Sequence, residues 1–106
     1  MAETYAQKLI AALEHPDPAV RRRAAWLLGR RRETGAVEAL LAAVAANAGD
    51  PYLLETVVEA LGLIGDPRAL GTLTELLRSS YLPVRVRAAR ALGRLGGAAA
   101  REALRE

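Results

Sequence analysis

The sequence predicts an all-α solenoid of about three antiparallel helix pairs, preceded by one extra helix. Three ten-residue segments, at 20–29, 53–62 and 84–93, align without gaps, and their final glycines are 33 and 31 residues apart. A period of that length is typical of stacked supersecondary units. Apolar residues recur at helical spacing, as in Val37, Leu40, Leu41 and Val44, and no segment alternates with the period of a strand.

The helices can be placed in order along the chain by their start and stop residues. We expect helices at 3–14, 18–29, 35–47, 51–63, 67–79, 83–94 and 98–105. The pairs Asp17-Pro18, Asp50-Pro51 and Asp66-Pro67 each put a side-chain acceptor before a proline, which is the usual start of a helix. Gly29, Gly62 and Gly93 are expected to end helices in a left-handed conformation. Because the connections are short, neighbouring helices should be antiparallel.

These elements divide one domain, 1–106, into a cap and three repeats. The predicted parts are an N-terminal capping helix at 1–16, repeat 1 at 17–49, repeat 2 at 50–80, and repeat 3 with a C-terminal cap at 81–106. A chain of this length buries roughly two-thirds of its unfolded surface. Alanine and leucine supply most of its apolar content, and phenylalanine is absent. Small side chains therefore favour close contact between helices.

The run DPAVRRRAAWLLG at 17–29, followed by a second amphipathic helix, resembles the HEAT-like repeat family. The likeness is strongest to the short repeats of bilin-lyase-type proteins. It implies a right-handed solenoid with the first helix of each pair (A) on the convex side and the second (B) on the concave side. It also implies that Arg21 and Arg85 pair with an acidic residue at a repeat start, for which Asp17 and Asp50 are candidates. The residues expected to face inward are Val20, Ala24, Ala25, Leu28, Leu53, Val57, Val58, Leu61, Val84, Ala88, Ala89 and Leu92, and Gly29, Gly62 and Gly93 complete the structural positions as helix ends.

The composition excludes several kinds of chemistry. There is no Cys, so disulfides, thiolate metal sites and Cys nucleophiles are ruled out. The lone His15 stands beside a proline in a turn, and no metal site, cofactor or catalytic residue is expected. Neither a leader segment nor a membrane-spanning stretch is visible, which predicts a cytoplasmic protein without a membrane partner.

Fifteen basic and twelve acidic residues give a net charge of +3, and fourteen of the basic residues are arginines. Most of them fall on the A helices, where two hypotheses compete. Glu55 lies in register with Arg22, and Glu59 with Arg90, which favours an ion-pair lattice between stacked helices. The alternative is a phosphate-binding surface, for which the best remaining candidates are Arg30, Arg31 and Arg32 at one edge.

The face formed by the B helices carries small side chains and little charge, so it suits the binding of a protein or peptide better than that of a nucleic acid. We therefore predict a non-catalytic protein–protein interaction scaffold, not an enzyme. The concave contact would use Lys8, Glu38, Thr72 and Glu75, and the edge contact would use Arg30, Arg31 and Arg32. Three alternatives remain, which are a nucleic-acid or polyanion binder, an accessory subunit of an enzyme such as a bilin lyase, and an engineered scaffold.

Overall fold

The computed structural model describes residues 2–105, apart from the side chains of 98–100 and 103. Its elements are α1 (Tyr5–Ala12), α2 (Pro18–Arg30), η1 (Thr34–Ala36), α3 (Val37–Ala46), α4 (Pro51–Ile64), η2 (Pro67–Ala69), α5 (Leu70–Leu76), α6 (Leu82–Leu95) and α7 (Gly97–Arg105). No strand occurs among them. The all-α solenoid prediction is confirmed. Met1 and Glu106, the ends of the predicted domain, lie outside the described residues.

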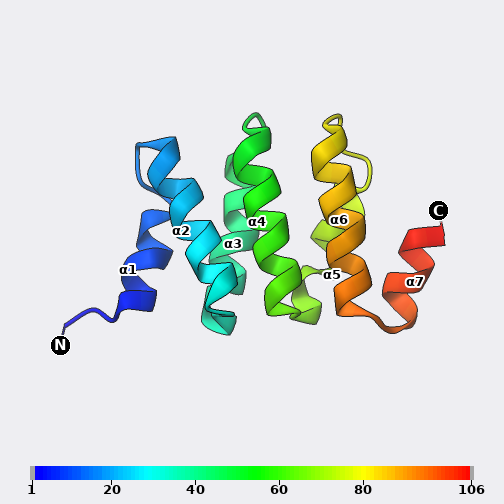
Figure 1. Cartoon of the computed structure of the whole chain (residues 1–106), viewed down its shortest axis with the longest axis horizontal. Coiled ribbons are helices and arrows are strands. Elements are labelled where there is room, and N and C mark those ends of the chain that lie inside the picture. The colour runs from blue at the N-terminus through cyan, green and yellow to red at the C-terminus, as the bar shows by residue number, and fades with distance from the viewer. Residues whose placement is uncertain (1, 106) are drawn as a thin grey trace.

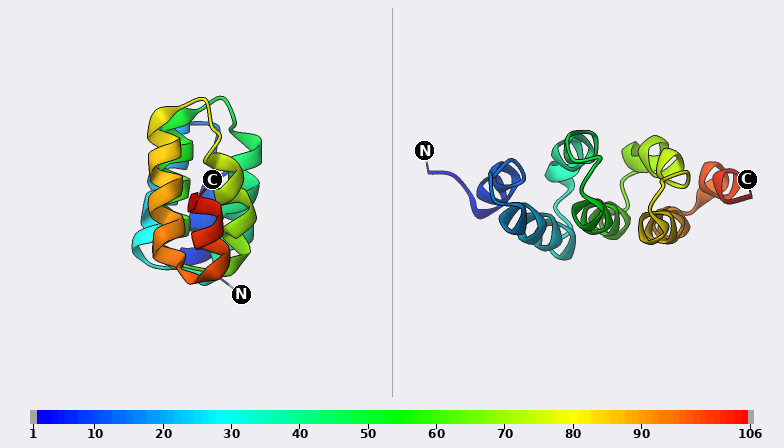
Figure 2. Two further views of the ribbon diagram at one scale, coloured as in Figure 1. Left: turned by 90° about the vertical axis from the view of Figure 1, so that its right-hand side faces the viewer. Right: turned by 90° about the horizontal axis from the view of Figure 1, so that it is seen from above.

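The helices stand side by side in a row from α1 to α7 (Figure 1). Seen from above, α2, α4 and α6 form one layer, here called the A layer, and α1, α3 and α5 form the other, the B layer (Figure 2). The molecule is elongated, with principal extents of 46 × 26 × 17 Å. Each A helix packs against the next A helix and against its own neighbours in the B layer, so no single centre gathers all the helices.

Aspartates start three of the helices, as predicted. The Oδ1 atoms of Asp17, Asp50 and Asp66 accept backbone hydrogen bonds at 2.9, 3.1 and 2.9 Å respectively. The third start differs from the expectation, because Pro67–Ala69 forms a 3₁₀ turn before α5 begins at Leu70. The predicted helix 67–79 is therefore shorter than expected and its α-helical part ends at Leu76. Likewise, the predicted helix 35–47 begins as a 3₁₀ turn at Thr34–Ala36.

The first helix carries a capping box that the sequence analysis missed. The Thr4 hydroxyl accepts from the backbone N–H of Gln7 at 3.1 Å, and the Thr4 N–H donates to the Gln7 side chain at 2.8 Å. Two otherwise unpaired backbone donors are satisfied by this exchange. The helix therefore begins at Tyr5, two residues later than predicted.

The prediction that Gly29, Gly62 and Gly93 end helices is wrong, because all three lie inside α2, α4 and α6. The left-handed cap of α4 is Gly65, with φ at 74°. Gly29 and Gly62 instead permit close helix contact. A Cβ on Gly29 would lie 2.7 Å from the Cα of Ala60, and one on Gly62 would lie 2.9 Å from the Cβ of Ala91.

The core lies between the two layers and consists mainly of leucine and valine. The fully buried large side chains are Leu28, Val37, Leu40, Leu53, Val57, Val58, Leu61, Leu73, Val84 and Leu92. Of the residues expected to face inward, Val20 and Ala89 are only half-buried. They mark the two ends of the A layer, since no described helix precedes α2 there or follows α6 in that layer.

A search for membrane-crossing helices among the described residues finds none that has both the length and the apolar content required.

Candidate partner-binding surfaces

A hollow with a volume of about 570 Å³ lies in the B layer between α1 and α3. We call it the B-layer groove. Its wall on α3 is built from alanines at helical spacing, so one smooth strip of the helix faces the space. The lining residues are Ile10, Ala11, Leu13, Glu14, Arg21, Ala39, Ala42, Ala43, Ala46 and Asn47. The groove is therefore apolar along most of its length, with polar groups contributed by Glu14, Arg21 and Asn47.

Arg21 is held in place by the turn that leads into α2. Its Nη1 atom donates to the carbonyls of His15 and Pro16 at 2.7 and 3.1 Å. Its Nε atom is buried and has no hydrogen-bond partner among the described residues. Asn47 closes the end of α3 by donating from Nδ2 to the Ala43 carbonyl at 2.8 Å.

The expected pairing of Arg21 and Arg85 with Asp17 or Asp50 is wrong. Arg85 donates to the carbonyl of Ser79 at 2.7 Å, which before α6 is the equivalent of the Arg21 contact with the His15 carbonyl before α2. The aspartates are occupied as helix caps. Both arginines therefore brace the inter-repeat turn through backbone carbonyls instead of carboxylates.

The four residues expected on the B face do not line the groove. Lys8, Glu38 and Glu75 are exposed, and Thr72 is half-buried. Glu38 forms an ion pair with Arg68, in which Oε1 of Glu38 lies 3.1 Å from Nη1 of Arg68. The sequence analysis described this face as one of small residues, but it selected charged and hydroxyl residues as binding candidates. The spacing of Ala39, Ala42, Ala43 and Ala46 is the signal that would have found the groove.

Arg68 connects the edges of two successive repeats. Besides Glu38, it donates to the Thr34 carbonyl at 3.3 Å and to Asp66 at 2.9 Å. The side-chain hydrogen bond from Arg68 lowers the pKa of Asp66, and the same bond raises the pKa of Arg68. The cluster is exposed to solvent, so it fixes the turn geometry more than it adds stability.

On the opposite layer, an ion-pair cluster joins α4 to α6. Arg87 lies 3.6 Å from Glu55 and 3.4 Å from Glu59, and Arg94 lies 3.0 Å from Glu59. Burial would raise the pKa of Glu59. However, the hydrogen bond from Arg94 and the charges of Arg94, Arg87 and Arg90 outweigh burial and hold that pKa below its ordinary value.

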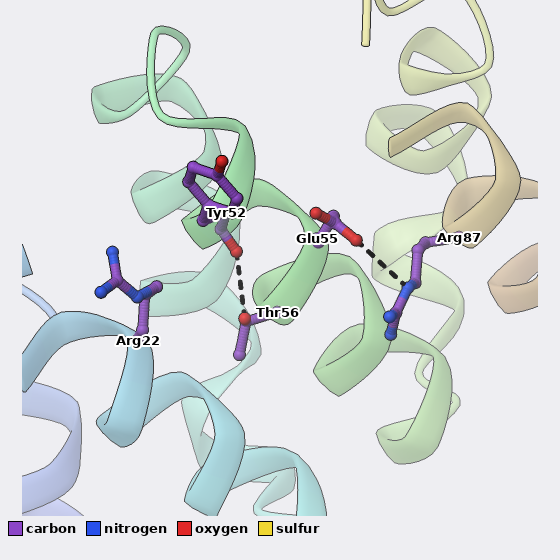
Figure 3. A pocket seen from close by; sticks show the side chains of 5 residues that line it. All are labelled: Arg22, Tyr52, Glu55, Thr56 and Arg87. Carbon is purple, nitrogen blue, oxygen red and sulfur yellow. Dashed lines mark hydrogen bonds and ion pairs between the residues drawn. The ribbon is translucent and has the colours of Figure 1, made fainter. Parts of the chain in front are cut away.

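The predicted ion-pair lattice forms on one side of α4 only, between α4 and α6. Figure 3 shows a hollow of about 490 Å³ in which Glu55 points toward Arg87, whereas Arg22 stands on α2 away from it. No ion pair joins Arg22 to Glu55 in the described part of the chain. Within α4, on the wall of the hollow, the Thr56 hydroxyl donates to the Tyr52 carbonyl one turn earlier, at 3.1 Å.

Several of the arginines expected to bind phosphate are engaged within the chain. Arg23 and Arg30 stack on Trp26, with their guanidinium carbons 5.4 and 5.1 Å from the ring centre. Arg31 pairs with Glu33 at 3.0 Å and lies 5.0 Å from the ring centre of Tyr5. Arg32 is exposed and adopts a positive φ of 51°. Trp26 itself remains 43% exposed beneath its arginines.

A row of antiparallel helix pairs that bury their apolar sides against each other defines an α-solenoid repeat protein. The HEAT repeats family matches residues 6–85 and again 41–106. The chain therefore belongs to the HEAT-repeat family.

Two relatives extend this assignment. The chain is 40% identical to "Phycocyanobilin lyase subunit alpha" of Picosynechococcus sp., over 84% of this chain and 37% of that protein. It is 47% identical to "Bilin biosynthesis protein PecE" of Mastigocladus laminosus, over 57% of this chain and 22% of that protein. The matched part of the chain thus spans 37% of the length of the first relative and 22% of the length of the second.

The prediction that this is not an enzyme is corrected by these relatives. One is named as a subunit of a lyase and the other as a bilin biosynthesis protein, so the relatives speak against that prediction. The sequence analysis found no catalytic residue and therefore kept an enzyme subunit such as a bilin lyase only as an alternative.

Proposed function

We propose that this chain is a component of a bilin-handling enzyme in which the solenoid binds and orients the reactants. The observation that supports this most is the 40% identity to a lyase subunit over 84% of the chain. Of the interpretations drawn from the sequence, it is closest to the enzyme-subunit alternative. Orientation of two reactants is itself a large source of rate enhancement.

The B-layer groove is the surface proposed to contact the bilin. A bilin is an open-chain tetrapyrrole with a long conjugated body and two carboxylates, so it needs an apolar wall and a few polar groups. The groove volume of about 570 Å³ falls in the usual range for small-molecule sites, which is roughly 300–1,000 Å³. Its alanine wall lets a flat ring system approach the backbone of α3, and Arg21 and Asn47 contribute polar groups to the lining.

Binding of an acceptor protein is a second part of this proposal. Lys8, Glu38, Thr72 and Glu75 and the edge arginines 30–32 remain predictions for that contact, as does the cytoplasmic location. We place the protein contact on the exposed rim of the B layer, where Lys8 and Glu75 are open to solvent.

The bilin contact is tested by titrating the purified chain with phycocyanobilin and following the induced circular dichroism of the pigment. The variant Ala42→Trp fills the groove, and Ala45→Trp places the same ring on an exposed position of α3 that does not line it. We expect Ala42→Trp to weaken binding at least about tenfold, which corresponds to 1.4 kcal/mol, and Ala45→Trp to bind like the unmodified chain. Absence of an induced signal, or equal binding by both variants, would refute the proposed site.

A further inference from the structure

The side of α2 that faces away from the core carries arginines around an exposed tryptophan. We call it the α2 basic face and define it by Arg22, Arg23, Trp26 and Arg30. At about 3.6 residues per turn, these four positions share one side of the helix, opposite the buried Ala25 and Leu28. Arg22 is half-buried and the other three are exposed. The face is therefore open to a partner along its whole length.

No carboxylate of the described residues neutralises this face. The helix α2 contains no acidic residue, and none of the ion pairs in the described part of the chain includes Arg22, Arg23 or Arg30. Glu55 is in register with Arg22, but it points toward Arg87 and leaves Arg22 alone on its side of the hollow (Figure 3). The positive charge of α2 thus lacks the carboxylates that balance the arginines of α6.

The hollow beside Arg22 can receive an acidic side chain. Its volume is about 490 Å³, and Tyr52 lines it together with Arg22. Tyr52 is 69% exposed, so its hydroxyl is open to solvent. A guanidinium and a phenol are both hydrogen-bond donors. A carboxylate that enters this end of the hollow therefore finds two donors and an uncompensated positive charge.

We propose that the α2 basic face binds an acidic helix of a partner protein. Tryptophan, tyrosine and arginine are the residues that most often dominate the energy of protein interfaces, and all three surround this hollow. Arg23 and Arg30 are seven residues apart, which is also the spacing of Arg87 and Arg94 on α6. The arginines of α6 are engaged by two glutamates one turn apart on α4. A helix with a carboxylate at each turn therefore has the spacing that the α2 basic face requires.

The same surface suits a protein better than a nucleic acid. Arg22 and Arg30 are only about 12 Å apart along the helix axis, and the carboxylates of Glu55 and Glu59 stand on the next helix of the layer. A nucleic-acid backbone needs a positive groove that follows it over several nucleotides, and these carboxylates interrupt such a path. The Trp26 ring already lies beneath two guanidinium groups, so it is not a free platform for a base.

The α2 basic face belongs to the A layer, whereas the B-layer groove lies in the other layer (Figure 2). The inference therefore does not depend on what the groove binds, and the two proposals can fail separately.

Trp26 makes the proposal directly testable, because it is the only tryptophan of the sequence and its fluorescence reports on this face alone. The probe is an acetylated and amidated peptide of Glu-Ala-Ala-Ala repeats, which contains no aromatic residue. We expect the peptide to change the Trp26 emission until it saturates, with an affinity that falls as the salt concentration rises. The same peptide with glutamine in place of glutamate should leave the emission unchanged.

Two double variants that remove equal charge make the result specific to the face. Arg22→Gln with Arg30→Gln removes two charges from the face, and Lys8→Gln with Arg78→Gln removes two exposed charges from α1 and from the turn after α5. Fluorescence anisotropy of a fluorescein-labelled peptide should show an affinity lowered at least about tenfold by the first pair and unchanged within about twofold by the second. Trp26→Ala should also weaken binding at least about tenfold. Helical circular dichroism verifies that each variant is folded.

Failure of the glutamate peptide to bind at low salt, or equal losses in the two double variants, would overturn the proposal. A single-stranded oligonucleotide is titrated in parallel as the competing polyanion. If it binds more tightly than the peptide and depends on the same arginines, the face is a nucleic-acid interface and the proposed protein contact is wrong.

Discussion

Replacing the three aligned glycines by alanine, one at a time, should give opposite effects on stability. All three lie within helices, where alanine is favoured over glycine by about 1 kcal/mol. At Gly93 nothing opposes that gain, because the added methyl group meets open space. Gly93→Ala should therefore stabilise the chain by about 1 kcal/mol, or roughly 4–8 °C in Tm for a domain of this size.

At Gly29 and Gly62 the same methyl group collides with the next helix. On Gly62 it would lie 2.9 Å from the Cβ and 3.0 Å from the Cα of Ala91, and on Gly29 it would lie 2.7 Å from the Cα of Ala60. Overpacking of this kind costs about 1–3 kcal/mol. After the helix-propensity gain, the net change at these sites is a loss of up to about 2 kcal/mol, larger at Gly29 because the added methyl group comes closer to the next backbone there, at 2.7 Å against 3.0 Å.

Urea unfolding followed by circular dichroism at 222 nm measures the three free-energy changes, and the double variant Gly29→Ala/Ala60→Gly supplies the control. Removing the methyl group of Ala60 relieves part of the collision, so the pair should be less destabilised than the sum of the single changes. Equal stabilisation by alanine at all three positions would refute the close packing of the A helices.

Two further predictions concern polar contacts of the A layer. Glu59→Gln should cost about 1 kcal/mol at pH 7, because it removes the charge that Arg87 and Arg94 pair with. Since the folded-state pKa of Glu59 lies below its ordinary value of 4.5, this contribution is complete above that pH and is lost as the pH falls through the folded pKa. The stability difference between Glu59→Gln and the unmodified chain should therefore shrink in acid, and a constant difference from pH 7 to pH 3 would contradict the ion-pair account. Arg85→Gln should cost about 1.5–3 kcal/mol in urea unfolding, because it removes a charged hydrogen bond to the Ser79 carbonyl, whereas a loss below about 0.5 kcal/mol, the usual range for surface substitutions, would show that the turn does not need this brace.

The helix starts were predictable from the sequence because their cause is local. An aspartate before a proline satisfies a backbone N–H within its own turn, whatever the rest of the chain does. Asp17 and Asp50 accordingly start helices where predicted. The glycines were misread for the complementary reason. Gly29 and Gly62 are determined by the Cα and Cβ atoms of another helix, some thirty residues away, and a local rule for helix ends does not describe that contact.

The binding surfaces were predicted less well than the fold. Charged residues attracted attention in the sequence, but Glu38 is paired with Arg68, and Arg30 is stacked on Trp26. Which of two arginines finds a carboxylate depends on the rotation of one helix against the next, and this is a tertiary property. The groove, by contrast, is built from alanines that carry no chemical signature beyond their spacing.

The two internal A-layer interfaces share a close glycine–alanine contact but differ in chemistry, and this difference favours the observed packing of the A helices. Between α4 and α6 the outer edge is ionic, because Glu59 meets Arg87 and Arg94. Between α2 and α4 the residues at the positions of those arginines are Thr56 and Leu63, so no such pairs form. If α6 followed α2 directly, Arg87 and Arg94 would face the arginine-stacked Trp26 instead of Glu59. Like charges would then meet, and the alternative stacking is disfavoured. The carboxylates of α4 therefore favour the packing of α6 on α4 over its packing on α2, although the glycine contacts alone do not distinguish the two.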